Sequence, residues 1–141
     1  MRFLALFLVL ILAMTALARE IPLNTIDKYE SGCIKKNPTS AGMSKCSSQV
    51  YAMWDKELNV VYSKLLRSLK SKENKSILFN AQKEWIQYRD KNLKLETAVG
   101  LEAERNSGGG HMYRTITSGN KIQILKNRVL ELQAMLDSLE M

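Results

Sequence analysis

The chain has 141 residues and a formal net charge of +7, with 45% hydrophobic residues, which suffices for one compact domain but not for two. The positive charge favours anionic partners. However, the lysines and arginines are scattered along the chain and are not gathered with aromatic side chains, a distribution that argues against nucleic-acid binding.

The first 18 residues have the pattern of a secretory signal peptide. Arg2 precedes an apolar run that reaches Met14, and Ala16-Leu17-Ala18 resembles a cleavage site. The run is shorter than the roughly 20 apolar residues that a membrane span needs. We therefore expect cleavage after Ala18, no permanent membrane anchor, and export to the periplasm of a Gram-negative bacterium or secretion. Because Arg2 is the only charge in this segment, the mature chain would carry +6 instead of +7.

The two cysteines, Cys33 and Cys46, both lie in the part of the chain that we expect to be exported. Thiols oxidise readily outside the cytoplasm. The pair cannot complete a structural zinc site without further ligands, and its spacing differs from that of a C-x-x-C redox pair. We therefore predict a structural disulfide and no metal.

Residues 19–43 are expected to form an N-terminal arm. They contain Pro22 and Pro38, and a short helix fits only between Thr25 and Ile34. Residues 44–141 follow as a helical bundle that forms one domain with the arm. The first long helix of this bundle has an apolar stripe at helical spacing, through Met43, Cys46, Val50, Met53, Trp54, Leu58, Val61, Leu65 and Leu69.

Two more amphipathic helices are expected after a turn at Ser71 or Lys72. The second helix runs from about Glu73 to Glu104, with the stripe Ile77, Leu78, Ala81, Trp85, Tyr88, Leu95 and Val99. Three glycines at 108–110 break it. The third helix follows Ser118-Gly119-Asn120, with the stripe Ile122, Leu125, Val129, Leu132, Leu136 and Leu139. The pattern predicts an all-α protein, an antiparallel three-helix bundle with a disulfide-clipped N-terminal arm.

The residues that could carry catalysis are poorly placed for it. His111 is the only histidine and lies in the glycine-rich loop, which offers it no rigid support in a catalytic triad. Asp55 and Glu57 are two residues apart on one predicted helix, and such side chains diverge. Because nucleotide and metal motifs are also missing, we expect no enzymatic activity and no cofactor.

Polar side chains border the apolar stripes of the first two long helices at helical spacing: Asp55, Asn59 and Tyr62 on one, Gln82, Trp85 and Arg89 on the other. One explanation is a network between helices, in which Arg89 reaches Asp55 or Glu57 and fixes the helix register. The alternative is that Trp85 and Arg89 belong to a partner-binding surface, because tryptophan and arginine are enriched among interface hot spots.

Several motifs together resemble the LprI-type lysozyme inhibitor family. They are the pair Cys33 and Cys46, E-L-N-x-x-Y at Glu57, Leu58, Asn59 and Tyr62, Q-x-x-W-x-x-x-R-D at Gln82, Trp85, Arg89 and Asp90, the glycine loop, and Arg128. The resemblance extends from about Cys33 to Leu136, although the second cysteine pair that members often carry is absent. It implies an exported, helical, non-catalytic protein of the bacterial envelope with a protein partner, for one member a lysozyme. We expect the motif's polar residues and Asp55 to form a structural network.

If a lysozyme is the partner, the segment from Ser107 to Tyr113 is a narrow tip that could enter its cleft, with His111 bonding a catalytic carboxylate. The competing explanation is a simple turn between helices. The hypothetical partner-binding residues are thus Trp85, Arg89, His111 and Tyr113. Two other functions stay open: an envelope adaptor or chaperone-like protein that binds another protein, and a protein that binds an anionic cell-wall polymer.

Overall fold

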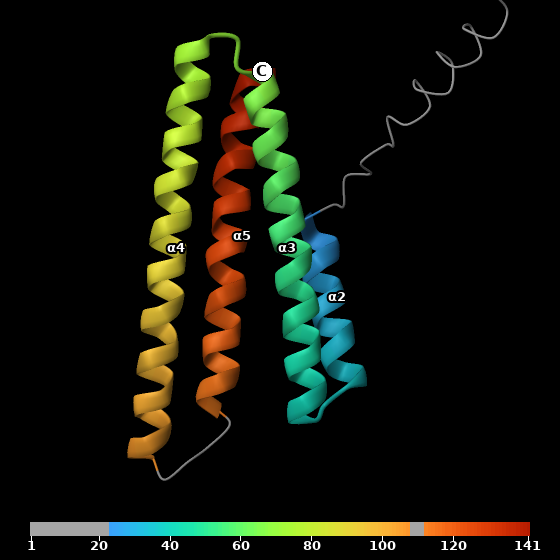
Figure 1. Ribbon diagram of the computed structural model, residues 1–141. Coiled ribbons are helices and arrows are strands. Elements are labelled where there is room, and N and C mark those ends of the chain that lie inside the picture. The colour runs from blue at the N-terminus through green and yellow to red at the C-terminus, as the bar shows by residue number, and fades with distance from the viewer. Residues whose placement is uncertain (1–22, 108–111) are drawn as a thin grey trace, which may run out of the picture.

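The computed structural model describes residues 23–107 and 112–141, with side chains in the second segment described from residue 117. These residues form four α-helices and no strand: α2 (Leu23–Lys36), α3 (Ser40–Ser68), α4 (Lys72–Asn106) and α5 (Met112–Glu140). The contacts place α2 against α3, α3 against α5, and α5 against α4 (Figure 1). The prediction of an all-α fold is confirmed.

The hydrophobic core lies mainly between α3 and α5. Its buried members are Val50, Trp54, Leu58, Val61 and Leu65 of α3, Ile122, Leu125, Val129, Leu132 and Leu136 of α5, Ile26 of α2 and Leu78 of α4. They recur every three or four residues because such spacing keeps side chains on one helix face. The stripes predicted for the first and third long helices are therefore largely confirmed, although Leu139 is 52% exposed.

The N-terminal arm is more ordered than predicted, because its short helix is a complete element of 14 residues, α2. Ile26 on this helix is fully buried in the core, and the carboxylate of Asp27 lies 2.7 Å from Nζ of Lys126 on α5. The predicted disulfide is present and joins Cys33 of α2 to Cys46 of α3, with the two Cα atoms 5.8 Å apart. The protein is thus a bundle of four described helices, not three helices with an arm.

A tight connection joins α2 to α3. Thr39 caps α3, and its hydroxyl accepts a hydrogen bond from the backbone N–H of Gly42 at 3.1 Å. A Cβ atom on Gly42 would lie 2.7 Å from the backbone oxygen of Asn37. Glycine is therefore required at this position, because the preceding turn packs directly against the first turn of the helix.

The predicted turn before the second long helix is confirmed. Ser71 caps α4, and its hydroxyl accepts from the N–H of Asn74 at 3.0 Å. The start of the last helix was predicted too late, because α5 begins at Met112 and includes Gly119. Two contacts with α4 hold this early part of α5. The Asn120 amide donates to Glu96 at 2.9 Å, and Gly100 leaves room for Thr117, whose Oγ1 would lie 2.8 Å from a Cβ atom at that position.

The prediction that the apolar stripe of the second long helix is buried in the core is mostly wrong. Only Leu78 and Gln82 are buried on α4, whereas Tyr88 and Leu95 are 58% and 61% exposed. The reason is tertiary: among the described helices only α5 contacts α4 extensively, and one neighbouring helix covers only a narrow arc of the surface of α4. None of the described helices combines the length and apolar character needed to cross a membrane.

Candidate functional site

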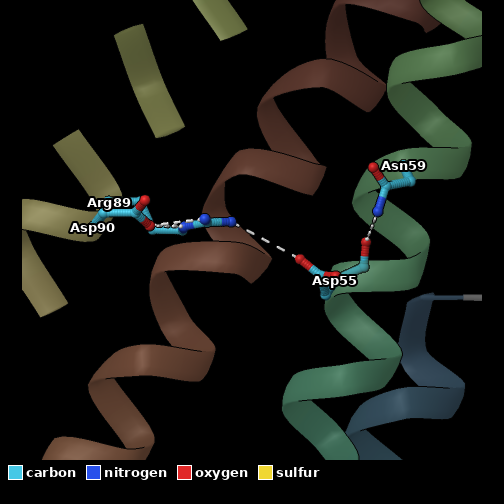
Figure 2. Close-up of polar contacts among 4 residues, drawn as sticks. All are labelled: Asp55, Asn59, Arg89 and Asp90. Atoms are coloured by element: carbon cyan, nitrogen blue, oxygen red, sulfur yellow. Dashed lines mark hydrogen bonds and ion pairs between the residues drawn. The ribbon is translucent and has the colours of Figure 1, made fainter. Parts of the chain in front are cut away.

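Arg89 links the two helices that carry the family-like motifs. Its side chain extends from α4 toward Asp55 on α3, as Figure 2 shows. Nη1 of Arg89 lies 3.9 Å from Oδ1 of Asp55, and Nη2 donates to Oδ1 of Asp90 at 2.7 Å. The Asn59 amide donates to the backbone oxygen of Asp55 at 2.8 Å. Of the two carboxylates expected for Arg89, the structure thus places Asp55 within ion-pair distance.

Trp85 lies between Arg89 and Arg128, the arginine of a second polar cluster that involves α5. The guanidinium carbons of Arg89 and Arg128 lie 5.5 and 5.7 Å from the centroid of its ring, within the range of cation–π attraction. Arg128 is buried; its Nε donates to Oε1 of Gln82 at 3.0 Å, and its Nη1 donates to Glu131 at 2.7 Å. The half-buried indole therefore joins both clusters into one arrangement.

The remaining polar residues predicted for the network occupy different environments. Glu57 is buried, 6% exposed, on the face of α3 that packs on the core. Tyr62 is partly buried against that core, while Asn59 is exposed. The structure thus brings together Asp55, Asn59, Arg89 and Asp90 around one bridge, and Gln82, Trp85 and Arg128 around another.

Sequence reasoning missed three participants. Glu131 pairs with Arg128 at i,i+3, a helical spacing that could have indicated the contact. The ion pair between Lys126 and Asp27 joins residues 99 apart in the sequence, so no local pattern could have indicated it. Nζ of the same lysine lies 5.5 Å from the ring centroid of Trp54.

The structure does not describe the side chains of His111 and Tyr113, which were predicted to contact a partner. His111 lies outside the described residues, and Tyr113 falls in the first turn of α5, where only the backbone is described. Their proposed role therefore stays a prediction. Over residues 23–107 and 117–141, no group of three or more histidine, cysteine or carboxylate side chains is arranged to hold a metal ion.

Two surface depressions flank the polar clusters. An apolar groove of about 410 Å³ lies where the end of α3, the start of α4 and the end of α5 meet, and Arg128 and Glu131 are among its lining residues. A shallower depression of about 590 Å³ follows α3 beside Asp55 and Asn59, and it carries the cations of Lys56, Lys64 and Arg67. The clusters thus lie between an apolar surface and a cationic one.

Arg128 and Arg89 are expected to differ in their contribution to stability. Arg128→Met should lower the free energy of unfolding by about 2 kcal/mol, because it leaves the buried Gln82 oxygen without its donor. Arg89→Met should lower the free energy of unfolding by about 1 kcal/mol or less, because both carboxylate partners are roughly half exposed and can be hydrated once the guanidinium is removed. Urea unfolding followed by circular dichroism measures both variants, and equal losses would contradict the proposed difference.

These features define a small all-α protein in which one disulfide and two arginine-centred polar clusters connect the helices. A family model described as "Lysozyme inhibitor LprI" matches residues 33–132, from the first cysteine to the last turns of α5. The chain belongs to this family, which confirms the resemblance inferred from the motifs. No curated protein and no solved structure is similar enough to match the chain.

Proposed function

We propose that the protein is an exported, non-catalytic inhibitor that acts by binding a lysozyme. The observation that carries the proposal is the family match, which includes the disulfide, both polar clusters and most of the α3–α5 core. Binding without catalysis also agrees with the roles of the arginines, because both guanidinium groups are engaged by carboxylates and an indole within the bundle.

We propose two separate contact regions for the lysozyme, Trp85 with Arg89, and His111 with Tyr113 at the start of α5. Arg89 lies 17 positions before the end of α4 at Asn106, which corresponds to about 26 Å at 1.5 Å per residue. We therefore treat the two regions as separate contacts on the lysozyme. We assign the cleft to the glycine-containing segment because His111 could bond one of the paired catalytic carboxylates, while Trp85 and Arg89 would contact the rim.

An inhibition assay with separate variants tests this assignment. The purified protein is expected to slow the clearing of a cell-wall suspension by lysozyme in a dose-dependent way. His111→Ala with Tyr113→Ala should weaken inhibition by about 30-fold or more if these side chains are hot spots. Lys94→Ala, an exposed change elsewhere on α4, serves as the control. Absence of inhibition at high molar excess, with every lysozyme tried, would contradict the proposal.

The net charge predicts which lysozymes are bound fastest. A mature chain of +6 repels a basic lysozyme and attracts an acidic one. Added salt should therefore speed association with a basic enzyme and slow association with an acidic enzyme. Stopped-flow or surface-based association rates at two ionic strengths measure this effect, and salt dependence of the same sign for both enzymes would contradict it.

A second candidate function is binding of an anionic cell-wall polymer. It is favoured by one observation, the depression on α3 where Lys56, Lys64 and Arg67 gather. Retention on an immobilised polyanion such as heparin, lost on addition of salt and reduced by Lys56→Glu with Arg67→Glu, would support this function. Unchanged retention of that double variant would exclude the depression as the binding site.

A further inference from the structure

One face of α4 is apolar but has no covering helix in the part of the chain that the structure describes. It consists of Ile77, Ala81, Tyr88, Leu95 and Val99, here called the α4 stripe. The four large members are 56% to 61% exposed, and the described residues of α3 show no comparably exposed large hydrophobic side chain. Large exposed apolar side chains grouped along one face of a helix are typical of an interaction site.

The place of α4 in the bundle leaves this face accessible. The helix has 35 residues and lies at one edge, with α5 as its neighbour and α2 at the opposite edge (Figure 1). Its contact with α5 buries Leu78 and Gln82, which lie on a different side of the helix from the stripe. A partner can therefore reach the stripe without disturbing the core.

The spacing of the α4 stripe is symmetric about its centre. Successive members are four, seven, seven and four residues apart, with Tyr88 in the middle. If two copies of α4 pack antiparallel, Ile77 lies opposite Val99 of the second copy, and the small Ala81 lies opposite the large Leu95. Seven-residue spacing keeps side chains at the contact of two packed helices, and small residues opposite large ones allow close packing.

The charge of α4 is complementary in the same antiparallel arrangement. The first third of the helix, residues 72–83, carries three lysines and one glutamate, for a net charge of +2. The last third, residues 95–106, carries three glutamates and one arginine, for a net charge of −2. Antiparallel pairing brings each positive third beside a negative third, whereas parallel pairing would bring like charges together.

We propose that the protein forms a two-fold symmetric dimer in which α4 packs antiparallel against α4 of a second copy. Such an interface uses the same surface on both copies, as a two-fold axis requires. The helix is about 52 Å long at 1.5 Å per residue, and a strip about 10 Å wide on each copy buries roughly 1,000 Å² in total. This area is at the lower limit of specific interfaces, so the dimer should dissociate at concentrations on the order of micromolar.

The flank of the stripe defines the register. Glu84 and Lys91 lie on the same side of α4, at nearly equal distances before and after Tyr88. In the antiparallel dimer, Glu84 of each copy would therefore lie beside Lys91 of the second copy. Near the helix ends Glu73 would meet Glu102 in the same way, a repulsive contact. Lys91→Glu should therefore weaken the dimer, and Glu84→Lys added to it should restore the original affinity. Glu102→Lys should strengthen the dimer.

Sedimentation velocity of the purified protein tests the proposal. Over a hundred-fold range of concentration centred on about 1 µM, the sedimentation coefficient should rise from near that of a monomer toward that of a dimer. Leu95→Glu should leave only the monomer, while Leu130→Glu, a change at an exposed leucine of α5, should leave association unchanged. Circular dichroism checks that each variant is folded.

Cross-linking determines the orientation. I77C and V99C chains are mixed under oxidising conditions. The cross-link between an I77C chain and a V99C chain is expected to form more than the cross-link between two I77C chains. A monomer at every concentration would overturn the proposal and leave the stripe to a different protein partner. Equal effects of Leu95→Glu and Leu130→Glu, or failure of the charge exchange to restore affinity in a folded double variant, would also overturn it.

Discussion

Trp54→Ala is expected to lower the free energy of unfolding by about 3–5 kcal/mol, the range for large aromatic side chains removed from a core. Trp54 is the largest of the fully buried side chains and lies in the contact between α3 and α5. Because small domains are stable by only about 5–15 kcal/mol, this single change should bring the protein close to unfolding. Thermal unfolding followed by far-ultraviolet circular dichroism measures the loss.

Two further variants separate volume from hydrogen bonding in this effect. Trp54→Phe should lower the free energy of unfolding by only about 1 kcal/mol, because phenylalanine keeps much of the buried volume. The change also removes an indole N–H that is buried without a hydrogen-bond partner among the described residues. Trp85→Ala should cost less than Trp54→Ala, since Trp85 is only partly buried. Comparable losses from alanine at both tryptophans would show that α4 is bound to the bundle more tightly than its burial indicates.

Removal of the disulfide is expected to lower the free energy of unfolding by about 3 kcal/mol. The bond closes a loop with a sequence separation of 13, and a loop of this size restricts the unfolded chain by about that amount in the chain-entropy model. The double change Cys33→Ala with Cys46→Ala tests the value, and denaturant unfolding of the wild-type protein with and without a reductant serves as a check that introduces no substitution.

The same loss should be unevenly distributed over the bundle. Without the disulfide, α2 is attached by the buried Ile26, by the ion pair of Asp27 with Lys126 and by the hydrogen bond from Tyr29 to Gln49. Amide hydrogen exchange should therefore become faster in α2, while exchange in α3 and α5 should change only with global stability. Equal acceleration in all helices would show that α2 unfolds together with the core and not before it.

The two arginine clusters suggest how the family motifs act together. Gln82, Trp85 and Arg89 of one motif lie on successive turns of α4, and they contact Arg128 of α5 and Asp55 of α3. We interpret the motif as holding α4 in register against its neighbours. A partner that binds at Trp85 would therefore also depend on this register, which explains why stability and inhibition must be measured on the same variants.

Much of the fold could be predicted from the sequence because its determinants are local. The apolar spacing of Val50 to Leu65 and of Ile122 to Leu136 requires helices with one buried face, and both faces form the core. Ser71 caps the N-terminus of α4, and this cap depends only on Ser71 and Asn74, which are three positions apart. The disulfide between Cys33 and Cys46 needed only the cysteine count and the expected oxidising compartment.

Which apolar residues are covered and which charges meet depends on how the helices pack. Leu78 and Leu95 belong to the same predicted stripe, yet one is buried and the other exposed, because helix periodicity does not define how many neighbours a helix has. The contact of Lys126 with Asp27 and the reach of Arg89 to Asp55 likewise depend on the packing order of the helices. The approximate positions of the long helices and the start of α4 at Ser71 follow from neighbours along the chain, and the disulfide follows from the presence of only two cysteines. Packing decided the exposed face of α4 and the polar clusters, because these depend on residues that only the folded chain brings together.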